Sequence, residues 1–225
     1  MLPLLALTSP PPARHQPVYP YEAAIIQDAD AYTNVRTDAN GRAAINATVR
    51  AGEVFLYDTE AYIQQREWIS VNVPRGRFCP EVQPLGYMHR SRIRPVSSLP
   101  ACRPPEMVYK CTLVPFRRQA HRIKYGPAPG SPWVETIDGL RPWGVDGTMP
   151  RTETSRLQVV VAGQPVAIPA SLYRNLYNGS AEFNAYKNGS TYFVVQFNSD
   201  GAGSYGLVWV LKPTGLVQRV LTDDC

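Results

Sequence analysis

The sequence predicts an all-β protein, and three observations support this fold class. Its 225 residues include 22 prolines and 16 glycines, and these two residue types break or weaken helix interiors. Short runs of β-branched and aromatic residues, bounded by Gly, Pro, Asn or Asp, recur along the chain as strands do. Apolar residues do not recur at helical spacing over three turns. We expect a small barrel followed by a second β-sandwich or β-barrel-like domain.

Composition divides the chain into four parts. Residues 1–21 read as a signal remnant or disordered tail, 22–96 as a first domain, 97–107 as a linker and 108–225 as a second β-rich domain. The linker is predicted because SSLPACRPPE contains three prolines and few large apolar residues. Each domain is then long enough to bury a core of its own.

The first residues, MLPLLALTSPPPARHQP, resemble the back end of a secretory signal, although a basic n-region is missing. A plain disordered tail is the alternative interpretation. No other segment approaches the roughly 18 apolar residues that are needed to cross a bilayer, so we expect no membrane span. The sequence therefore predicts a periplasmic or secreted protein.

Four cysteines bear on the same question, namely Cys79, Cys102, Cys111 and Cys225. An even number suits two disulfides in an oxidising compartment. We favour Cys79–Cys102 with Cys111–Cys225, and Cys102–Cys111 is a rival pairing. Four reduced thiols in a cytosolic protein are the remaining alternative. Because none of the cysteines forms a Cys-x-x-Cys pair, a structural zinc site is not expected.

The formal charge of +5 is unevenly distributed. In residues 22–96, nine arginines are balanced by nine acidic residues, whereas residues 97–225 hold thirteen basic and nine acidic residues. The basic residues cluster in RRQAHRIK at 117–124. Such a cluster either attracts anionic polymers or is simply a solvated edge. Nucleic-acid binding is not expected, because no recognisable nucleic-acid motif accompanies the cluster.

The first domain reads as about five short strands separated by turns, which predicts a small closed barrel. The expected strands lie in residues 23–26, 28–36, 47–60, 66–73 and 85–96, and the last segment contains a short helical turn. Alternation along these strands assigns the following residues to the barrel core: Val35, Val54, Ile69, Val71 and Ile93.

Four segments of this domain occur in a recognisable order. They are DAYTNVR (30–36), RAGEVF (50–55), REWISV (66–71) and GYMHRSRIRPV (86–96). The succession resembles the bacterial SH3-like family, in which an Asn-Val-Arg strand, a Gly turn, a Trp strand and a Gly-Tyr/Trp-Val-His segment follow one another. The loop at 74–85, which contains Cys79, is unusually long for this family. It has the potential to cover the usual binding face.

The resemblance implies a binding function, since domains of this family recognise peptidoglycan peptides or protein segments. Tyr32, Trp68, Tyr87 and His89 are the candidate ligand-binding residues, because aromatic rings offer a large rigid area with a polar handle. The alternative for each is packing in the core or at the rim of the barrel.

The second domain carries about seven apolar runs at strand length, which predicts a β-sandwich or an open barrel. The runs lie at residues 108–116, 133–137, 156–169, 181–186, 191–197, 204–211 and 215–221. NSDGAGS reads as a hairpin connector. The segment DGAGSY before VWV faintly resembles uncharacterised domains of exported bacterial proteins, and this likeness implies no function.

Enzyme chemistry finds little support in the second domain. His121 is its single histidine, which excludes a zinc amidase and leaves only Cys111–His121 or a serine–His121 pair for nucleophilic catalysis. Asp138, Asp146 and Asp200 are candidates for a glycosidase carboxylate pair, but each precedes glycine as in ordinary turns. We expect no catalytic site, no metal and no cofactor.

The function that the sequence favours is a non-catalytic, exported envelope protein that binds a cell-wall peptide or a protein partner through its SH3-like domain. Two alternatives stay open. One is a periplasmic immunity or inhibitor protein against a wall-degrading toxin, with loop 74–85 projecting towards the toxin. The other is a cell-wall hydrolase that uses carboxylates.

Overall fold

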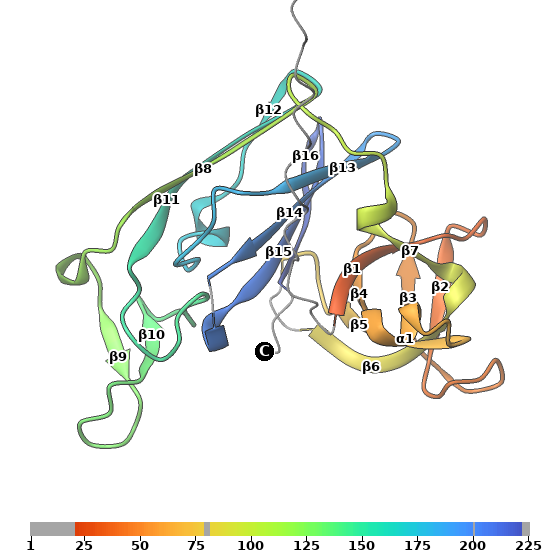
Figure 1. Ribbon diagram of the computed structural model, residues 1–225, viewed down its shortest axis with the longest axis horizontal. Helices are drawn as coiled ribbons and strands as arrows, with labels where there is room; N and C mark the ends of the chain where they lie inside the picture. The colour runs from red at the N-terminus through yellow and green to blue at the C-terminus, as the bar shows by residue number, and fades with distance from the viewer. Residues whose placement is uncertain (1–20, 79–81, 200, 222–225) are drawn as a thin grey trace, which may run out of the picture.

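The computed structural model confirms that the protein is all-β (Figure 1). The structure describes residues 21–78, 82–199 and 201–221, so the expected export signal lies outside the described residues. Antiparallel sheets account for most of the described chain. Within this part, no helix is long and apolar enough to span a bilayer.

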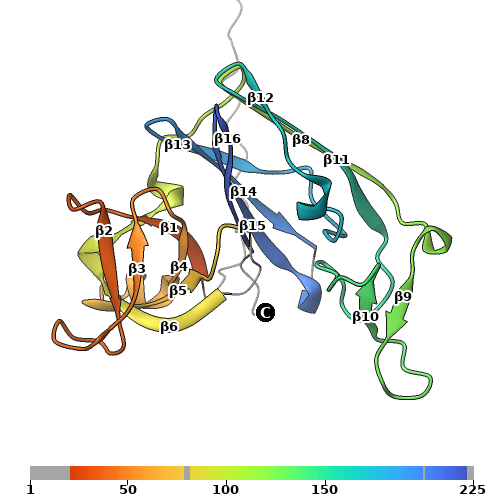
Figure 2. The same ribbon diagram turned by 180° about the vertical axis from the view of Figure 1, so that it is seen from behind.

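Strands β1 to β7 form one antiparallel sheet that coils into a barrel (Figures 1 and 2). They are β1 Tyr21–Ile26, β2 Tyr32–Arg36, β3 Ile45–Arg50, β4 Phe55–Asp58, β5 Trp68–Pro74, β6 Val82–His89 and β7 Ile93–Pro95. Their order across the sheet is β3-β2-β6-β5-β4-β1-β7. A short 3₁₀ helix, η1 (Arg90–Arg92), supplies the expected turn before β7.

The barrel core is made of side chains that alternate along the strands, because successive residues of a strand point to opposite faces. Val35, Ile69, Val71 and Ile93 are buried in it, as the sequence predicts. Val54 is also buried, but it belongs to a different cluster on the outside of the barrel. The sequence therefore predicts the burial of Val54 correctly and its surroundings incorrectly.

A short helix, α1 (Thr59–Ile63), between β4 and β5 was not predicted. Asp58 caps its start, accepting a hydrogen bond from the Ala61 N–H at 2.9 Å, and Glu60 lies in the first turn. Both features stabilise a helix N-terminus. The helix is too short to show apolar residues at helical spacing, so its capping residues are the only sequence signal for it.

The second half contains two sheets and a separate hairpin. The outer sheet, in the order β12-β11-β8, is built from β8 Met107–Pro115, β11 Thr152–Val161 and β12 Gln164–Val166. The central sheet follows chain order in β13 Asn184–Asn188, β14 Thr191–Asn198, β15 Tyr205–Lys212 and β16 Gly215–Leu221. The hairpin pairs β9 (Ile123–Tyr125) with β10 (Val134–Ile137). The remaining 3₁₀ helices are η2 Val96–Ser98, η3 Arg118–Ala120, η4 Ala170–Leu172 and η5 Gly201–Gly203.

The outer and central sheets enclose a core of their own, so this half is a small sandwich. Tyr109 of β8 and Trp209 of β15 are among its largest buried residues. The Trp209 indole N–H donates to the Tyr109 hydroxyl, which in turn donates to the side-chain carbonyl of Gln196. These bonds satisfy the polar ends of two aromatic residues that are otherwise surrounded by apolar side chains.

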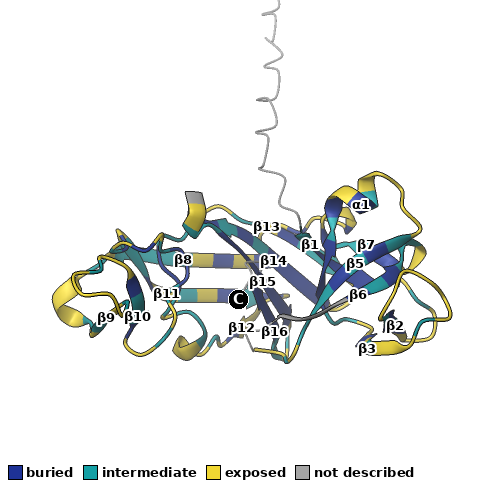
Figure 3. Cartoon of the chain, turned by 90° about the horizontal axis from the view of Figure 1, so that it is seen from below, coloured by how far each residue is buried: buried dark blue, intermediate teal, exposed yellow. Residues whose placement is uncertain are grey.

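The central sheet also packs against the barrel, which makes the molecule a succession of three layers (Figure 1). The second face of the sheet contributes Phe193, Val208, Val210 and Val220, and all of them are buried against the barrel wall. The barrel contributes Ala23 and Ile25 of β1, Val54 and Leu56 at β4, and Val96 and Leu99 after β7. In Figure 3, buried residues accordingly predominate along β14, β15 and β16.

A pair of hydrogen bonds fixes the two halves in register. The buried side chain of Gln218 accepts from the Val54 N–H at 2.8 Å and donates to the Val54 carbonyl at 3.0 Å. The Arg219 N–H also donates to the Arg77 carbonyl at 2.7 Å. The side-chain amide of Gln218 therefore satisfies both backbone groups of Val54, just before β4, as a neighbouring strand would.

The proline-rich segment 97–107 is held along the edge of β13. Lys187 N–H donates to the Pro100 carbonyl and Cys102 N–H donates to the Ala185 carbonyl, each at 2.9 Å. Leu99 and Cys102 are buried. Part of the backbone of this segment is thus paired with β13, and Leu99 and Cys102 are covered.

No disulfide is present among the described residues, which corrects the expected pairing. Cys102 is a buried free thiol and Cys111 a half-buried one, so the rival Cys102–Cys111 bond is not formed. The two thiols do not pair because they lie on different elements. Cys102 lies beside β13 of the central sheet, whereas Cys111 belongs to β8 of the outer sheet. Cys79 and Cys225, the other members of the expected pairs, lie outside the described residues.

Candidate functional site

Three of the four predicted ligand-binding residues lie together on the outside of the barrel. In the pairing of β5 with β6, Trp68 is opposite His89 and Ser70 is opposite Tyr87. Their neighbours Ile69, Val71 and Met88 are completely buried, so Trp68, Tyr87 and His89 point outwards. The Trp68 and His89 rings are 5.5 Å apart between centroids in an edge-to-face contact. We call this surface the aromatic face.

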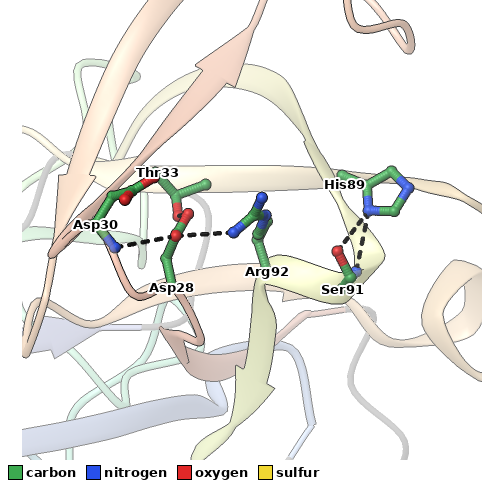
Figure 4. Close-up of polar contacts among 6 residues, drawn as sticks. All are labelled: Asp28, Asp30, Thr33, His89, Ser91 and Arg92. Carbon is green, nitrogen blue, oxygen red and sulfur yellow. Dashed lines mark hydrogen bonds and ion pairs between the residues drawn. The ribbon is translucent and has the colours of Figure 1, made fainter.

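His89 has a structural task besides its ring contact. Its Nδ1 atom accepts a hydrogen bond from the Ser91 N–H at 3.3 Å and so caps η1 (Figure 4). The Ser91 hydroxyl lies 2.8 Å from the same nitrogen. The other ring nitrogen is directed to Glu67, whose carboxylate is 3.5 Å away. His89 therefore holds the end of β6 and supports Trp68, and less of its surface is left for a ligand.

The turn between β2 and β3 borders the aromatic face. A Cβ atom at Gly41 would lie 3.9 Å from Cζ2 of Trp68, so the turn is in van der Waals reach of the indole. The Arg36 guanidinium donates to the Ala43 carbonyl at 2.7 Å and fixes this turn. Arg36 also pairs with Tyr87 across β2 and β6. The β2–β3 turn therefore forms one wall of the aromatic face.

Tyr32 is separated from the other three residues. It begins β2, four residues before Arg36, which corresponds to about 13 Å along a strand. It pairs with Arg50 and is 50% exposed. Because β2 and β6 are antiparallel, Tyr32 is displaced from Tyr87 towards the η1 end of the barrel. Tyr32 thus lies on the outer surface of the barrel but outside the aromatic face.

Asp28 and Arg92 lie near this end of the barrel and were not identified from the sequence. Asp28 accepts hydrogen bonds from the Thr33 hydroxyl at 2.8 Å through Oδ2 and from the Asp30 N–H at 3.2 Å through Oδ1, and Arg92 is 2.8 Å from Oδ1 (Figure 4). The Thr33 and Asp30 bonds, aided by Arg92, hold the pKa of Asp28 below its usual value. This cluster ties the β1–β2 loop to η1, and so it positions both Tyr32 and His89.

The long loop at 74–85 does not cover the aromatic face where it is described. β5 ends at Pro74, which pairs with Val82, whereas Trp68 and His89 lie at the opposite end of the same hairpin. The Arg77 carbonyl is bonded to β16. Cys79, Pro80 and Glu81 lie outside the described residues. The described part of the loop thus joins the barrel to the central sheet.

His121, the histidine on which nucleophilic catalysis would depend, is held between two carboxylates. Its Nδ1 is 2.7 Å from Asp138 Oδ2, and its Nε2 is 2.8 Å from Glu153 Oε2 but outside hydrogen-bond geometry. Its ring is stacked on Phe116, with centroids 4.7 Å apart. Both ring nitrogens therefore face carboxylates, and neither is directed at a serine or a cysteine. The contacts attach the β9–β10 hairpin to β11.

Cys111 has no features of an activated nucleophile. Its sulfur is 3.9 Å from the Thr154 hydroxyl, and burial raises the pKa of its thiol. Among the described residues, His, Cys, Asp and Glu side chains do not gather in groups of three that would suit a metal ion. The two carboxylates beside His121 lie on opposite sides of its ring, so they do not converge on one point.

The three aspartates considered for glycosidase chemistry occupy unlike positions. Asp138 and Gly139 both have positive φ, 53° and 78°, and form the tight turn that the Asp-Gly sequence predicts. Asp138 accepts from the Arg122 N–H at 2.9 Å in addition to its contact with His121, and these bonds lower its pKa. Asp146 lines a cleft in a different loop, and Asp200 lies outside the described residues. A carboxylate pair across a cleft is therefore not seen among the described residues.

Comparison with known proteins gives no further guidance, since no family model, no curated protein and no solved structure matches the chain.

Proposed function

We propose that the chain is a non-catalytic binding protein of the cell envelope, exported to the periplasm or secreted, whose barrel is a bacterial SH3-like domain. The barrel binds a cell-wall peptide or a peptide segment of an envelope protein. The aromatic face is the binding surface, with Trp68 and Tyr87 as its principal contacts.

The observation that carries this proposal is the difference between the two sides of the barrel. β1 and β4 are buried on both faces, inside the barrel and beneath the central sheet. On the side of β5 and β6, Trp68, Tyr87 and His89 are only half-buried. Aromatic side chains that are held in place but not used in a core are typical of binding surfaces.

The spacing of the rings favours an extended peptide as the ligand. Trp68 and Ser70, like His89 and Tyr87, are two residues apart on one strand, which corresponds to about 7 Å. Alternate side chains of an extended peptide have the same spacing, so neighbouring side chains on one side of it contact Trp68 and Tyr87 together. The half-buried rings supply rigid apolar area, and the Tyr87 hydroxyl supplies a polar end.

The experiment is a pull-down from envelope extract and from purified sacculi with the double variant Trp68→Ala, Tyr87→Ala. We expect the variant to lose partners that the native chain retains. The matched control is Ile63→Ala, which removes an apolar side chain that is 71% exposed on α1 of the same barrel. Circular dichroism and thermal unfolding establish that each variant is folded.

An unchanged set of partners with the double variant would remove the aromatic face from consideration. Loss of the same partners with Ile63→Ala would equally contradict the proposal, because it would indicate a nonspecific effect of barrel stability. Binding to sacculi alone and binding to a protein alone distinguish a wall ligand from an envelope partner.

A further inference from the structure

The hairpin of β9 and β10 projects from the end of the molecule opposite to the barrel (Figures 1 and 3). Its two strands are joined by a loop at residues 126–132. Two large apolar side chains flank this loop and are exposed, namely Tyr125 at 38% and Trp133 at 57%. Exposed aromatic side chains that stand next to each other on a protrusion indicate a surface that meets another molecule.

The indole of Trp133 is held in one orientation by the backbone around it. A Cβ atom at Gly147 would come within 2.3 Å of Cε3 of the ring, and one at Gly126 would lie 3.7 Å from Cδ1. The Trp133 N–H donates to the Ser131 hydroxyl at 3.2 Å, and the Gly126 N–H donates to the Trp133 carbonyl at 2.9 Å. The exposed part of the ring is therefore fixed before it meets a partner, which lowers the entropy cost of binding.

The base of the hairpin is fixed to the rest of the second half. Val134 and Ile137 of β10 are buried in a small cluster with Tyr177. The Val134 N–H also donates to the Gly147 carbonyl at 2.9 Å, and His121 lies between carboxylates of the hairpin and of β11. The protruding aromatic pair is thus attached to a packed support.

Basic side chains lie on β9 and just before it: Arg117, Arg118, Arg122 and Lys124. All four are exposed, and Lys124 is paired with Glu135 at 2.9 Å. Arg117 and Arg118 form no ion pair within the part of the chain that the structure describes. Residues 115–138 contain four basic and two acidic residues, which gives this segment a net charge of +2. The hairpin therefore attracts an anionic partner.

The apolar and basic features follow one another along the length of the hairpin. The loop at its tip, GPAPGSP, has no charged residue. Tyr125 and Trp133 come next, and Lys124 and Arg122 lie further from the tip on β9. This order matches the depth profile of an anionic bilayer, where Trp and Tyr lie at the level of the headgroups and Lys and Arg meet the anionic surface. A soluble anionic polymer would contact the basic residues but would gain nothing from the uncharged tip.

We propose that the β9–β10 hairpin binds an anionic lipid surface. The tip and the rings of Tyr125 and Trp133 enter the headgroup region, and Arg117, Arg118 and Arg122 contact lipid phosphates. The hairpin lies on the surface of the bilayer and does not cross it. This site is separate from the aromatic face of the barrel, so failure of either proposal leaves the other intact.

The test is co-sedimentation of the full chain with vesicles of phosphatidylcholine that contain about 40% phosphatidylglycerol, with pure phosphatidylcholine vesicles as the matched probe. We expect at least roughly 10-fold tighter binding to the anionic vesicles, a loss of binding as salt is added, and a blue shift of tryptophan emission. Trp133→Ala removes the blue shift and weakens binding by roughly 10-fold, because the largest inserted side chain is lost.

Charge variants test the electrostatic part of the site. The double variant Arg117→Gln, Arg118→Gln weakens binding to the anionic vesicles by at least roughly 10-fold. Asp146 is exposed and precedes Gly147, against which Trp133 lies, so Asp146→Asn removes a repelling carboxylate and strengthens binding by roughly 3-fold. The matched control is Arg42→Gln, Arg66→Gln, which removes the same charge from exposed positions on the barrel and leaves binding unchanged. Circular dichroism establishes that each variant is folded.

Absence of binding up to roughly 5 mM anionic lipid overturns the proposal, and so does equal affinity for the neutral vesicles. Binding to dextran sulfate that is as tight as binding to the vesicles, with no blue shift on either, indicates a polymer ligand and overturns it as well. If Trp133→Ala does not fold, small bicelles of the same lipids with a nitroxide-labelled lipid decide the question for the native chain. Paramagnetic broadening of the Trp133 indole N–H signal supports the site, whereas broadening confined to Trp68 contradicts it.

Discussion

The two sides of the barrel differ in how their strands are buried. β1 and β4 place Ala24, Ile26, Phe55 and Tyr57 inside the barrel, and their alternate residues lie beneath the central sheet. β2 and β5 bury only one face, and their other residues are half-buried or exposed. The two kinds of strand belong to one sheet, so the difference arises from what lies outside it.

This difference is visible in the sequence once the layers are known. Strands that are buried on both faces read as continuous apolar runs, such as AAII in β1 and VFLY at β4, whereas half-buried strands alternate, as in YTNVR and WISVN. The run LVWVL in β15 follows the same rule, because Trp209 faces the outer sheet and Val208 and Val210 face the barrel. Continuous runs therefore mark the contact between the two halves.

The largest effect is expected where the layers meet. Phe193 is completely buried between the central sheet and the barrel, so Phe193→Ala leaves a cavity and lowers the free energy of unfolding by about 3–5 kcal/mol. Urea unfolding followed by far-UV circular dichroism measures the loss. A change below about 1 kcal/mol would contradict tight packing of the two halves.

Gln218→Ala tests the hydrogen bonds at the same contact. The substitution leaves the buried N–H and carbonyl of Val54 without their partner, and each unsatisfied group costs about 1–3 kcal/mol. Gln218→Glu is the informative companion, because it keeps an acceptor for the N–H but has no donor for the carbonyl. If both variants are as stable as the native chain, Gln218 does not fix the register of the two halves.

A smaller, pH-dependent effect is expected on the exposed side of the barrel. The pKa of Asp28 is lowered in the folded state, so its contribution to stability is present above the unfolded pKa of about 3.9 and is lost as the pH falls through the folded value. Asp28→Asn should therefore destabilise the protein near about pH 7, and the difference from the native chain should shrink near about pH 2.5. Thermal midpoints at both pH values measure this. If the destabilisation caused by Asp28→Asn grows as the pH falls, the pKa of Asp28 is not lowered in the folded state.

The smallest effect is expected for Tyr32→Ala. The side chain is half exposed and lies outside every core cluster of the described residues, so stability should change by no more than about 0.5 kcal/mol. Chemical denaturation of the variant alongside Phe193→Ala gives the direct comparison of the two sides. A loss of several kcal/mol for Tyr32→Ala would remove the distinction between them.

The sequence predicts individual strands well because alternation and turn residues are local properties. It predicts the barrel core at Ile69 and Val71 and the Asp-Gly turn at Asp138. It does not predict α1, whose single turn shows no period, or β9, which is only three residues long. The layered arrangement is also missed, since a continuous apolar run is equally compatible with a short isolated strand.

The candidate site is predicted in part, for a similar reason. Trp68, Tyr87 and His89 stand out in the sequence as aromatic candidates, but their contact depends on the register of β5 with β6, which no local pattern specifies. The Asp28–Arg92 pair joins residues far apart in sequence. The cleft lined by Asp146 arises from three separate segments, so its residues do not form a motif.

The contact between the halves has a consequence for the order in which the chain folds. Ala23 and Val220 belong to the same buried cluster, so one of the first described strands is covered by the last. During synthesis the apolar outside of β1 and β4 is therefore exposed to solvent until β16 has left the ribosome. Such late long-range contacts slow folding and leave an apolar surface open to aggregation. We therefore expect aggregation of the nascent chain to be greatest before its last strands are complete.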